Sequence, residues 1–164
     1  MQKVIFLALS LFTFGYINGQ DTITKTILIN KKYFKGAIFP KDYKVHFNLG
    51  KEYLTKRFTP TPQEIETFES GLIEQINNLH NSFSISDPRR FFKRHKRQYL
   101  GYINNKGDSL ILAQFVDRGS FLSIKRRLHF SGWKEYFIGC LSDFCYKYLR
   151  LYQFNLTTDK LEIP

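Results

Sequence analysis

Residues 61–79, TPQEIETFESGLIEQINNL, decide the fold class because they carry the clearest helix signal in the chain. Thr61 stands at the N-cap, Pro62 at the first helical position and Glu64 three residues after the cap, which is a capping box with a proline start. An apolar stripe follows at steps of three and four: Ile65, Phe68, Leu72, Ile76 and Leu79, with Ile73 beside it. The stretch predicts one amphipathic helix that lies on another part of the molecule. Its acidic residues are expected on the solvent side: Glu64, Glu66, Glu69 and Glu74.

After Pro88 the spacing changes from helical to alternating, which is typical of β-strands. Residues 98–104 and 109–116 flank a turn in which Gly107 supplies a positive φ, so this region predicts a hairpin. Other strands are expected at residues 23–30, 43–47, 121–130, 133–140, 146–156 and 161–164. The stretch 31–60 is rich in Lys, Gly and Pro and is otherwise the least readable part of the chain.

One helix followed by a run of antiparallel strands is an α+β pattern. The economical packing is one long amphipathic helix on a curved antiparallel β-sheet, the shape of cystatin-like and nuclear-transport-factor-like folds. Composition agrees with a folded protein, since 43% of the residues are hydrophobic and the 17% that are aromatic suit a half-exposed sheet.

Residues 1–19 are expected to be a signal peptide and not part of the fold. Lys3 provides a positive start, residues 4–14 are an unbroken apolar run and residues 15–19 are a small-residue exit. That run is shorter than the ~20 residues of a membrane-spanning helix, so cleavage after Gly19 is favoured over a retained anchor. Residues 20–164 are then one α+β domain of about 145 residues, exported to the periplasm, the outer surface or the medium.

Basic residues outnumber acidic ones by 25 to 14, a formal net charge of +11. The excess gathers in two clusters, which either pair with acidic groups and are solvated, or bind an anionic partner. An acidic protein or an anionic envelope polymer fits an exported chain, whereas nucleic acid is ranked low because an exported protein seldom meets it. The candidate anion-binding residues are Arg89, Arg90, Lys93, Arg94, Lys96, Arg97, Lys125, Arg126 and Arg127.

Several short stretches combine turns and strand ends in a recognisable order: Phe58-Thr59-Pro60-Thr61, Lys96-Arg97-Gln98-Tyr99, Gly101-Tyr102-Ile103, Gly107-Asp108, Trp133 and Tyr152-Gln153-Phe154-Asn155-Leu156. Together they resemble small exported proteins of unknown function from Bacteroidetes-type bacteria, over about two thirds of the chain. The resemblance implies a periplasmic or surface location. It supplies no catalytic residue, since the shared stretches are structural.

Cys140 and Cys145 enclose a four-residue loop between two expected strands. In an exported chain such a pair favours a hairpin disulfide over free thiols. A metal site is disfavoured because the four histidines are scattered and no paired Cys and His spacing is present.

No common catalytic, phosphate-binding or dinucleotide-binding motif is present, so no catalytic residue, metal or cofactor is assigned. The sequence favours an exported binding module over an enzyme. The alternative is a small hydrolase or isomerase with a cavity between helix and sheet, in which Asp117 or Asp143 pairs with His129. Three tyrosines could line a ligand pocket, although sheet packing is the commoner role: Tyr146, Tyr148 and Tyr152.

Overall fold

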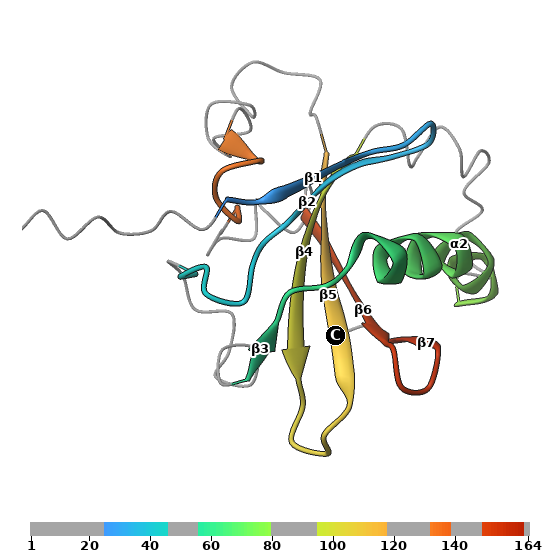
Figure 1. Ribbon diagram of the computed structural model, residues 1–164. Coiled ribbons are helices and arrows are strands. Elements are labelled where there is room, and N and C mark those ends of the chain that lie inside the picture. The colour runs from blue at the N-terminus through green and yellow to red at the C-terminus, as the bar shows by residue number, and fades with distance from the viewer. Residues whose placement is uncertain (1–24, 46–55, 80–94, 118–131, 139–148, 163–164) are drawn as a thin grey trace, which may run out of the picture.

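The computed structural model describes residues 25–45, 56–79, 95–117, 132–138 and 149–162, and for residues 73 and 76–79 the backbone alone (Figure 1). Within these ranges the chain forms one helix, α2 (Pro62–Leu79), and a seven-stranded sheet. The strands are β1 (Ile27–Asn30), β2 (Lys35–Ile38), β3 (Arg57–Phe58), β4 (His95–Ile103), β5 (Ser109–Asp117), β6 (Leu149–Asn155) and β7 (Lys160–Glu162). The predicted α+β class is confirmed. The expected signal peptide, the strand at 121–130 and both cysteines lie outside the described residues.

The sheet has the order β1-β2-β4-β5-β6-β7, and β3 pairs with β4 off this path. All pairs are antiparallel except β2 and β4, which run parallel. The sheet is therefore mixed and mostly antiparallel, where the sequence predicted an antiparallel one. A parallel pair needs a long crossover, and here β3 and α2 lie between β2 and β4 in the sequence.

The predicted hairpin is confirmed as β4 and β5, which pair over nine residues each. Gly107 has a φ of 89°, the left-handed conformation that glycine adopts without strain. The Asn104 Oδ1 atom accepts hydrogen bonds from the backbone N–H groups of Lys106 and Asp108. These hydrogen bonds to the Asn104 side chain stabilise the turn.

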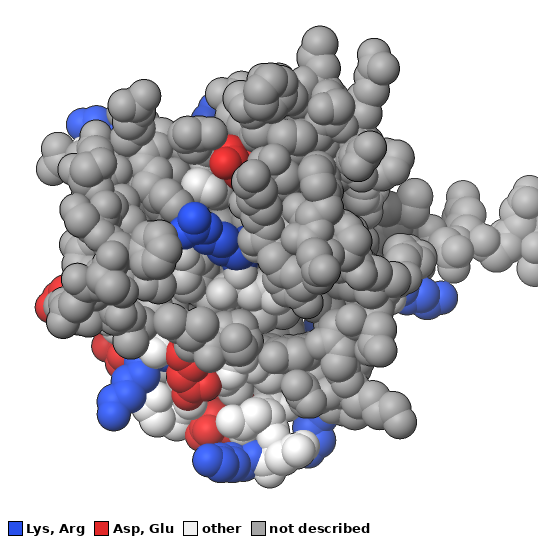
Figure 2. Space-filling view, turned by 180° about the vertical axis from the view of Figure 1, so that it is seen from behind, with Lys and Arg blue, Asp and Glu red and all other residues white. Residues whose placement is uncertain are grey.

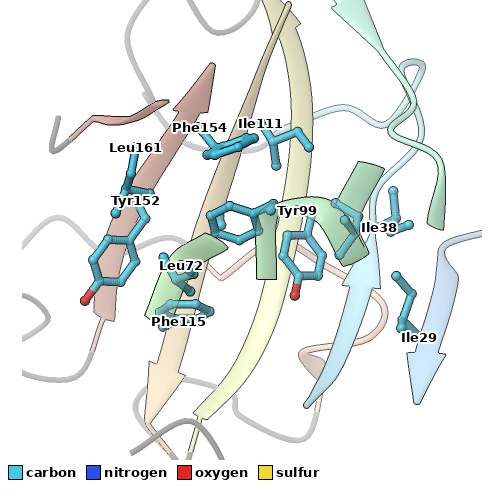
Figure 3. Packing of buried hydrophobic residues seen from close by; sticks show 12 residues of the cluster. Ile29, Ile38, Leu72, Tyr99, Ile111, Phe115, Tyr152, Phe154 and Leu161 are labelled. Carbon is cyan, nitrogen blue, oxygen red and sulfur yellow. The ribbon is translucent and has the colours of Figure 1, made fainter. Parts of the chain in front are cut away.

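The predicted start of the helix is confirmed, because the capping box closes in both directions. The Glu64 N–H donates to the Thr61 hydroxyl at 3.2 Å, and the Thr61 N–H donates to the Glu64 carboxylate at 2.7 Å. The described part of the apolar stripe is buried against one face of the sheet: Ile65, Phe68 and Leu72. Figure 3 shows this layer, including Leu72 and Phe154. The Phe68 ring lies 5.5 Å from that of Phe154.

The segment 132–138 is not the strand predicted for 133–140. The backbone N–H groups of Glu135 and Tyr136 both donate to the Gly132 carbonyl, which makes a tight turn. The segment packs Trp133 and Phe137 against the sheet face opposite α2. Nothing local in the sequence distinguishes this apolar turn from a strand, because its partners come from β4 and β5.

The N-terminal part also differs from the prediction. Residues 43–45 are not in a strand, since the Tyr43 N–H donates to the Pro40 carbonyl and closes a turn. Residues 46–47 lie outside the described range. The stretch without a clear signal holds β2 and β3. β1 begins at Ile27, with residues 25–26 outside the strand and residues 23–24 of the predicted strand outside the described range. The closing strand is confirmed as β7.

In the described parts of the chain, no helix is both long enough and apolar enough to cross a membrane.

Candidate functional site

Most of the candidate anion-binding residues lie outside the described ranges: Arg89, Arg90, Lys93, Arg94, Lys125, Arg126 and Arg127. The two that the structure places are Lys96 and Arg97, which are neighbours in β4. Because side chains alternate along a strand, these two point to opposite faces of the sheet. The two described residues of the predicted anion-binding set therefore do not share a surface.

Arg97 lies inside the molecule and not on a binding surface. Its exposed fraction is 0%, and its Nε atom lies 2.8 Å from Oε1 of Glu69 in α2. The Tyr99 hydroxyl donates to the same carboxylate oxygen at 2.7 Å. Arg97 is thus buried and paired with a carboxyl group of the protein itself, which corrects its expected role as a contact for an external anion.

Glu69 is also buried, although the sequence pattern predicted a solvent-exposed position. The signal was present: position 69 lies four residues after Ile65 and three before Leu72, within the apolar stripe. Burial raises the pKa of the Glu69 carboxyl to about 7, while Arg97 and the Tyr99 hydroxyl act to lower it. Burial together with the adjacent carboxylate raises the pKa of Tyr99 well above its usual value.

Two aromatic rings close the guanidinium of Arg97 off from solvent. Its Cζ atom lies 5.2 Å from the centre of the Phe34 ring and 4.8 Å from that of Phe115. Arginine suits this position because a planar, weakly hydrated cation stacks on rings and still pairs with a carboxylate. The network has the geometry of a structural link between α2 and the sheet.

A second polar network lies on the opposite face and was not expected from the sequence. Gln98 and Gln114 face each other across β4 and β5, and the Gln114 amide donates to Oε1 of Gln98 at 3.0 Å. The Gln98 amide also donates to the carbonyls of Trp133 and Tyr136. The Ile138 N–H donates to Gln98 Oε1, so these side chains hold segment 132–138 in place.

Lys96, the other described member of the predicted set, lies beside this segment. It is half-buried, with its Nζ 5.2 Å from the centre of the Trp133 ring. The exposed Lys134 approaches the same ring, at 5.8 Å. Two ammonium groups therefore share one indole at this end of the sheet.

The largest described group of exposed cations lies in residues 25–45, which we call the lysine segment. It contains one acidic residue, Asp42, and six lysines, every one exposed: Lys25, Lys31, Lys32, Lys35, Lys41 and Lys44. Lys35 lies opposite Lys96 in the parallel register of β2 and β4, so the segment adjoins the start of β4. On the face shown in Figure 2, by contrast, described basic and acidic side chains lie together along one rim.

The expected catalytic and pocket residues give no active site within the described ranges. His129 and Asp143 lie outside them, and so do Tyr146 and Tyr148. The register places Asp117 opposite His95, which is buried near Phe115. Tyr152 is buried with its ring 5.0 Å from that of Phe115, which confirms sheet packing for this residue.

Metal binding has no support in these ranges either. No group of three or more His, Cys, Asp or Glu residues that could hold a metal ion is found in the described portion of the chain.

Comparison with known proteins identifies no relative of the chain. No protein-family model, no curated protein and no solved structure matches the chain. What is shown is the architecture, one helix packed on a mixed, mostly antiparallel sheet.

Proposed function

We propose that the protein is an exported binding module that engages an anionic partner, an acidic protein or an anionic envelope polymer, through a basic surface. The observation that carries the proposal is the lysine segment, which contains six exposed lysines and one acidic residue, Asp42. Such a density of one charge creates a field that attracts and orients an oppositely charged partner.

The internal chemistry supports a binding role over a catalytic one. The buried Arg97 pairs with Glu69 inside the molecule, so the surface charge of the chain is carried by other residues. In the described interface between α2 and the sheet, Ile65, Phe68 and Leu72 are buried, and the Phe68 ring is in edge contact with Tyr99. This packing favours the binding module over the alternative of a small hydrolase or isomerase with a cavity at that interface.

Three finer features belong to the same proposal. Export by a signal peptide at residues 1–19 brings the protein to anionic polymers and acidic proteins of an envelope. A disulfide between Cys140 and Cys145 suits that oxidising location. A relationship to small exported proteins of unknown function from Bacteroidetes-type bacteria, with a cystatin-like or nuclear-transport-factor-like pattern, agrees with the helix lying on the sheet.

The experiment measures retention of the purified protein on immobilised polyglutamate and on an anionic polysaccharide, between about 0.05 M and about 0.5 M salt. The test variant is Lys25→Gln, Lys32→Gln and Lys35→Gln combined, which spares the Lys31 ion pair to Glu66. The matched control changes three exposed lysines elsewhere: Lys56, Lys106 and Lys160.

Both variants lose the same net charge, so only position differs between them. We expect the test variant to bind about tenfold or more weakly and the control to bind like the wild type. Equal weakening in both variants would mean that binding follows net charge alone and would overturn the proposed surface. A further variant has Arg89, Arg90, Lys93 and Arg94 changed to Ser. It measures how much the basic run that precedes β4 contributes to retention on the anionic polymers.

A further inference from the structure

We propose that the outer edge of β1 is a docking site for an extended acidic segment of a partner protein, which adds to the sheet as a strand. This inference rests on the proposed function and names the partner class and the mode of binding. It comes from a difference between the two ends of the sheet, β1 and β7 (Figure 1).

The β7 edge is short and is covered by the helix. β7 has three residues, and the Leu161 N–H donates to Oε1 of Gln75 in α2 at 2.6 Å. The exposed residues of this edge carry opposite charges, Lys160 and Glu162. Side-chain capping and charge are the usual means by which a protein closes a sheet edge.

The β1 edge is different. Among the described strands β1 pairs with β2 alone, in a four-residue antiparallel ladder. It exposes two large apolar side chains, Ile27 at 41% and Leu28 at 52%. Because successive residues point to opposite faces, an added strand would cover one of them on each side of the sheet. The edge therefore offers backbone pairing and apolar contact together.

The positive charge around β1 favours an acidic strand over a second copy of the chain. Lys25 precedes β1, Lys31 and Lys32 follow it, and Lys35 lies opposite Asn30 in β2. A second copy of the chain, added edge to edge, would bring two sets of these lysines together, and like charges at an edge oppose such pairing. A strand that alternates acidic and apolar residues meets the lysines with opposite charge and the apolar pair with apolar contact.

The test uses the full protein and a fluorescent eight-residue peptide that alternates Glu and Val. A control peptide has the same charge and length, with two internal Val residues replaced by Pro, which removes backbone donors. The protein variant is Leu28→Asp, with Thr158→Asp at an exposed turn as its matched charge control. Both sites are exposed, so both variants are expected to fold.

We expect the Glu–Val peptide to bind the wild type and the Thr158→Asp variant alike, about tenfold more tightly than it binds Leu28→Asp and than the Pro peptide binds the wild type. Amide hydrogen exchange in residues 27–30 should slow by about tenfold or more with the peptide bound. Equal binding of both peptides, without slowed exchange, would overturn strand addition and leave charge-driven binding intact. Failure of every anionic probe to bind would overturn the proposed function as well.

Discussion

Arg97 and Gln98 are neighbours in β4, both with an exposed fraction of 0%, yet they meet opposite faces of the sheet and different partners. On one face a cation pairs with the carboxylate of Glu69 and links two regular elements, α2 and the sheet. On the other face a neutral amide binds the backbone of an irregular segment, residues 132–138. The same strand therefore binds a helix through an ion pair on one face and a turn through amide hydrogen bonds on the other.

The difference shows what each chemistry is suited to. An amide side chain both donates and accepts, so Gln98 satisfies two carbonyls and an N–H of the turn, groups that no ladder pairs. An ion pair offers one strong contact, but it requires that two charges be removed from water. We therefore expect losses on the helix face to unfold the protein and losses on the other face to release the turn.

The largest effect is expected for Arg97→Met at pH 8, where Glu69 loses its cation and must either stay buried as a bare carboxylate or take up a proton. Removing one partner of a buried pair costs about 3–5 kcal/mol of unfolding free energy. Urea unfolding measures the loss. The double variant Arg97→Met, Glu69→Leu should recover most of it, because no charge then remains buried. If the double variant is as unstable as the single one, the packing of the Arg97 side chain, and not its charge, holds this face together.

The second largest effect is expected in the pH dependence of stability, which depends on Glu69 on the helix face. The pKa of Glu69 is raised to about 7 in the folded protein, so the native state binds a proton more tightly than the unfolded chain. The stabilisation is fully present below the unfolded pKa and is lost as pH rises through about 7. Relative to Glu69→Gln, the wild type should lose on the order of 3 kcal/mol between pH 4.5 and pH 8. Parallel pH profiles would mean that folding leaves the pKa of Glu69 unchanged.

Gln98→Met should cost less, about 2 kcal/mol, because the freed groups of the turn can reach water when it opens. Its signature is local: amide exchange in residues 132–138 should speed up more than exchange in α2. Gln114→Met is the comparison variant within the same network, since the Gln114 amide makes two hydrogen bonds there, to Gln98 and to the Ile138 carbonyl. Uniformly faster exchange across the described elements would show that the two faces unfold as one unit.

The smallest effect is expected for Lys96→Gln, which removes a cation from the half-exposed surface over Trp133. The loss should be about 0.5 kcal/mol, typical of an exposed cation–ring contact. Trp133 is the single tryptophan of the chain, so its fluorescence should shift without a change in fold. Lys134→Gln, at the more distant lysine, should shift it less. A loss above about 2 kcal/mol would place Lys96 among the structural residues of this face.

Local signals were sufficient for the elements whose contacts are close in sequence. The capping box joins Thr61 to Glu64, the hairpin turn needs Gly107, and the stripe of Ile65, Phe68 and Leu72 repeats within three turns. These features act over a few residues, so the sequence reveals them. The candidate site was harder to predict, because alternation along β4 placed Lys96 beside Trp133 on one face and Arg97 in the core on the other.

The sequence by itself determined the α+β class, the helix start, the central hairpin and the excess of basic charge. Only the tertiary structure decided the parallel pairing of β2 with β4, the turn at 132–138 and the meeting of Glu69 with Arg97. Propensity and capping are properties of neighbouring residues, whereas these three features join residues distant in the chain. Packing of the helix and the turn on opposite faces brings those partners together, and their charge and hydrogen bonds then become part of the core.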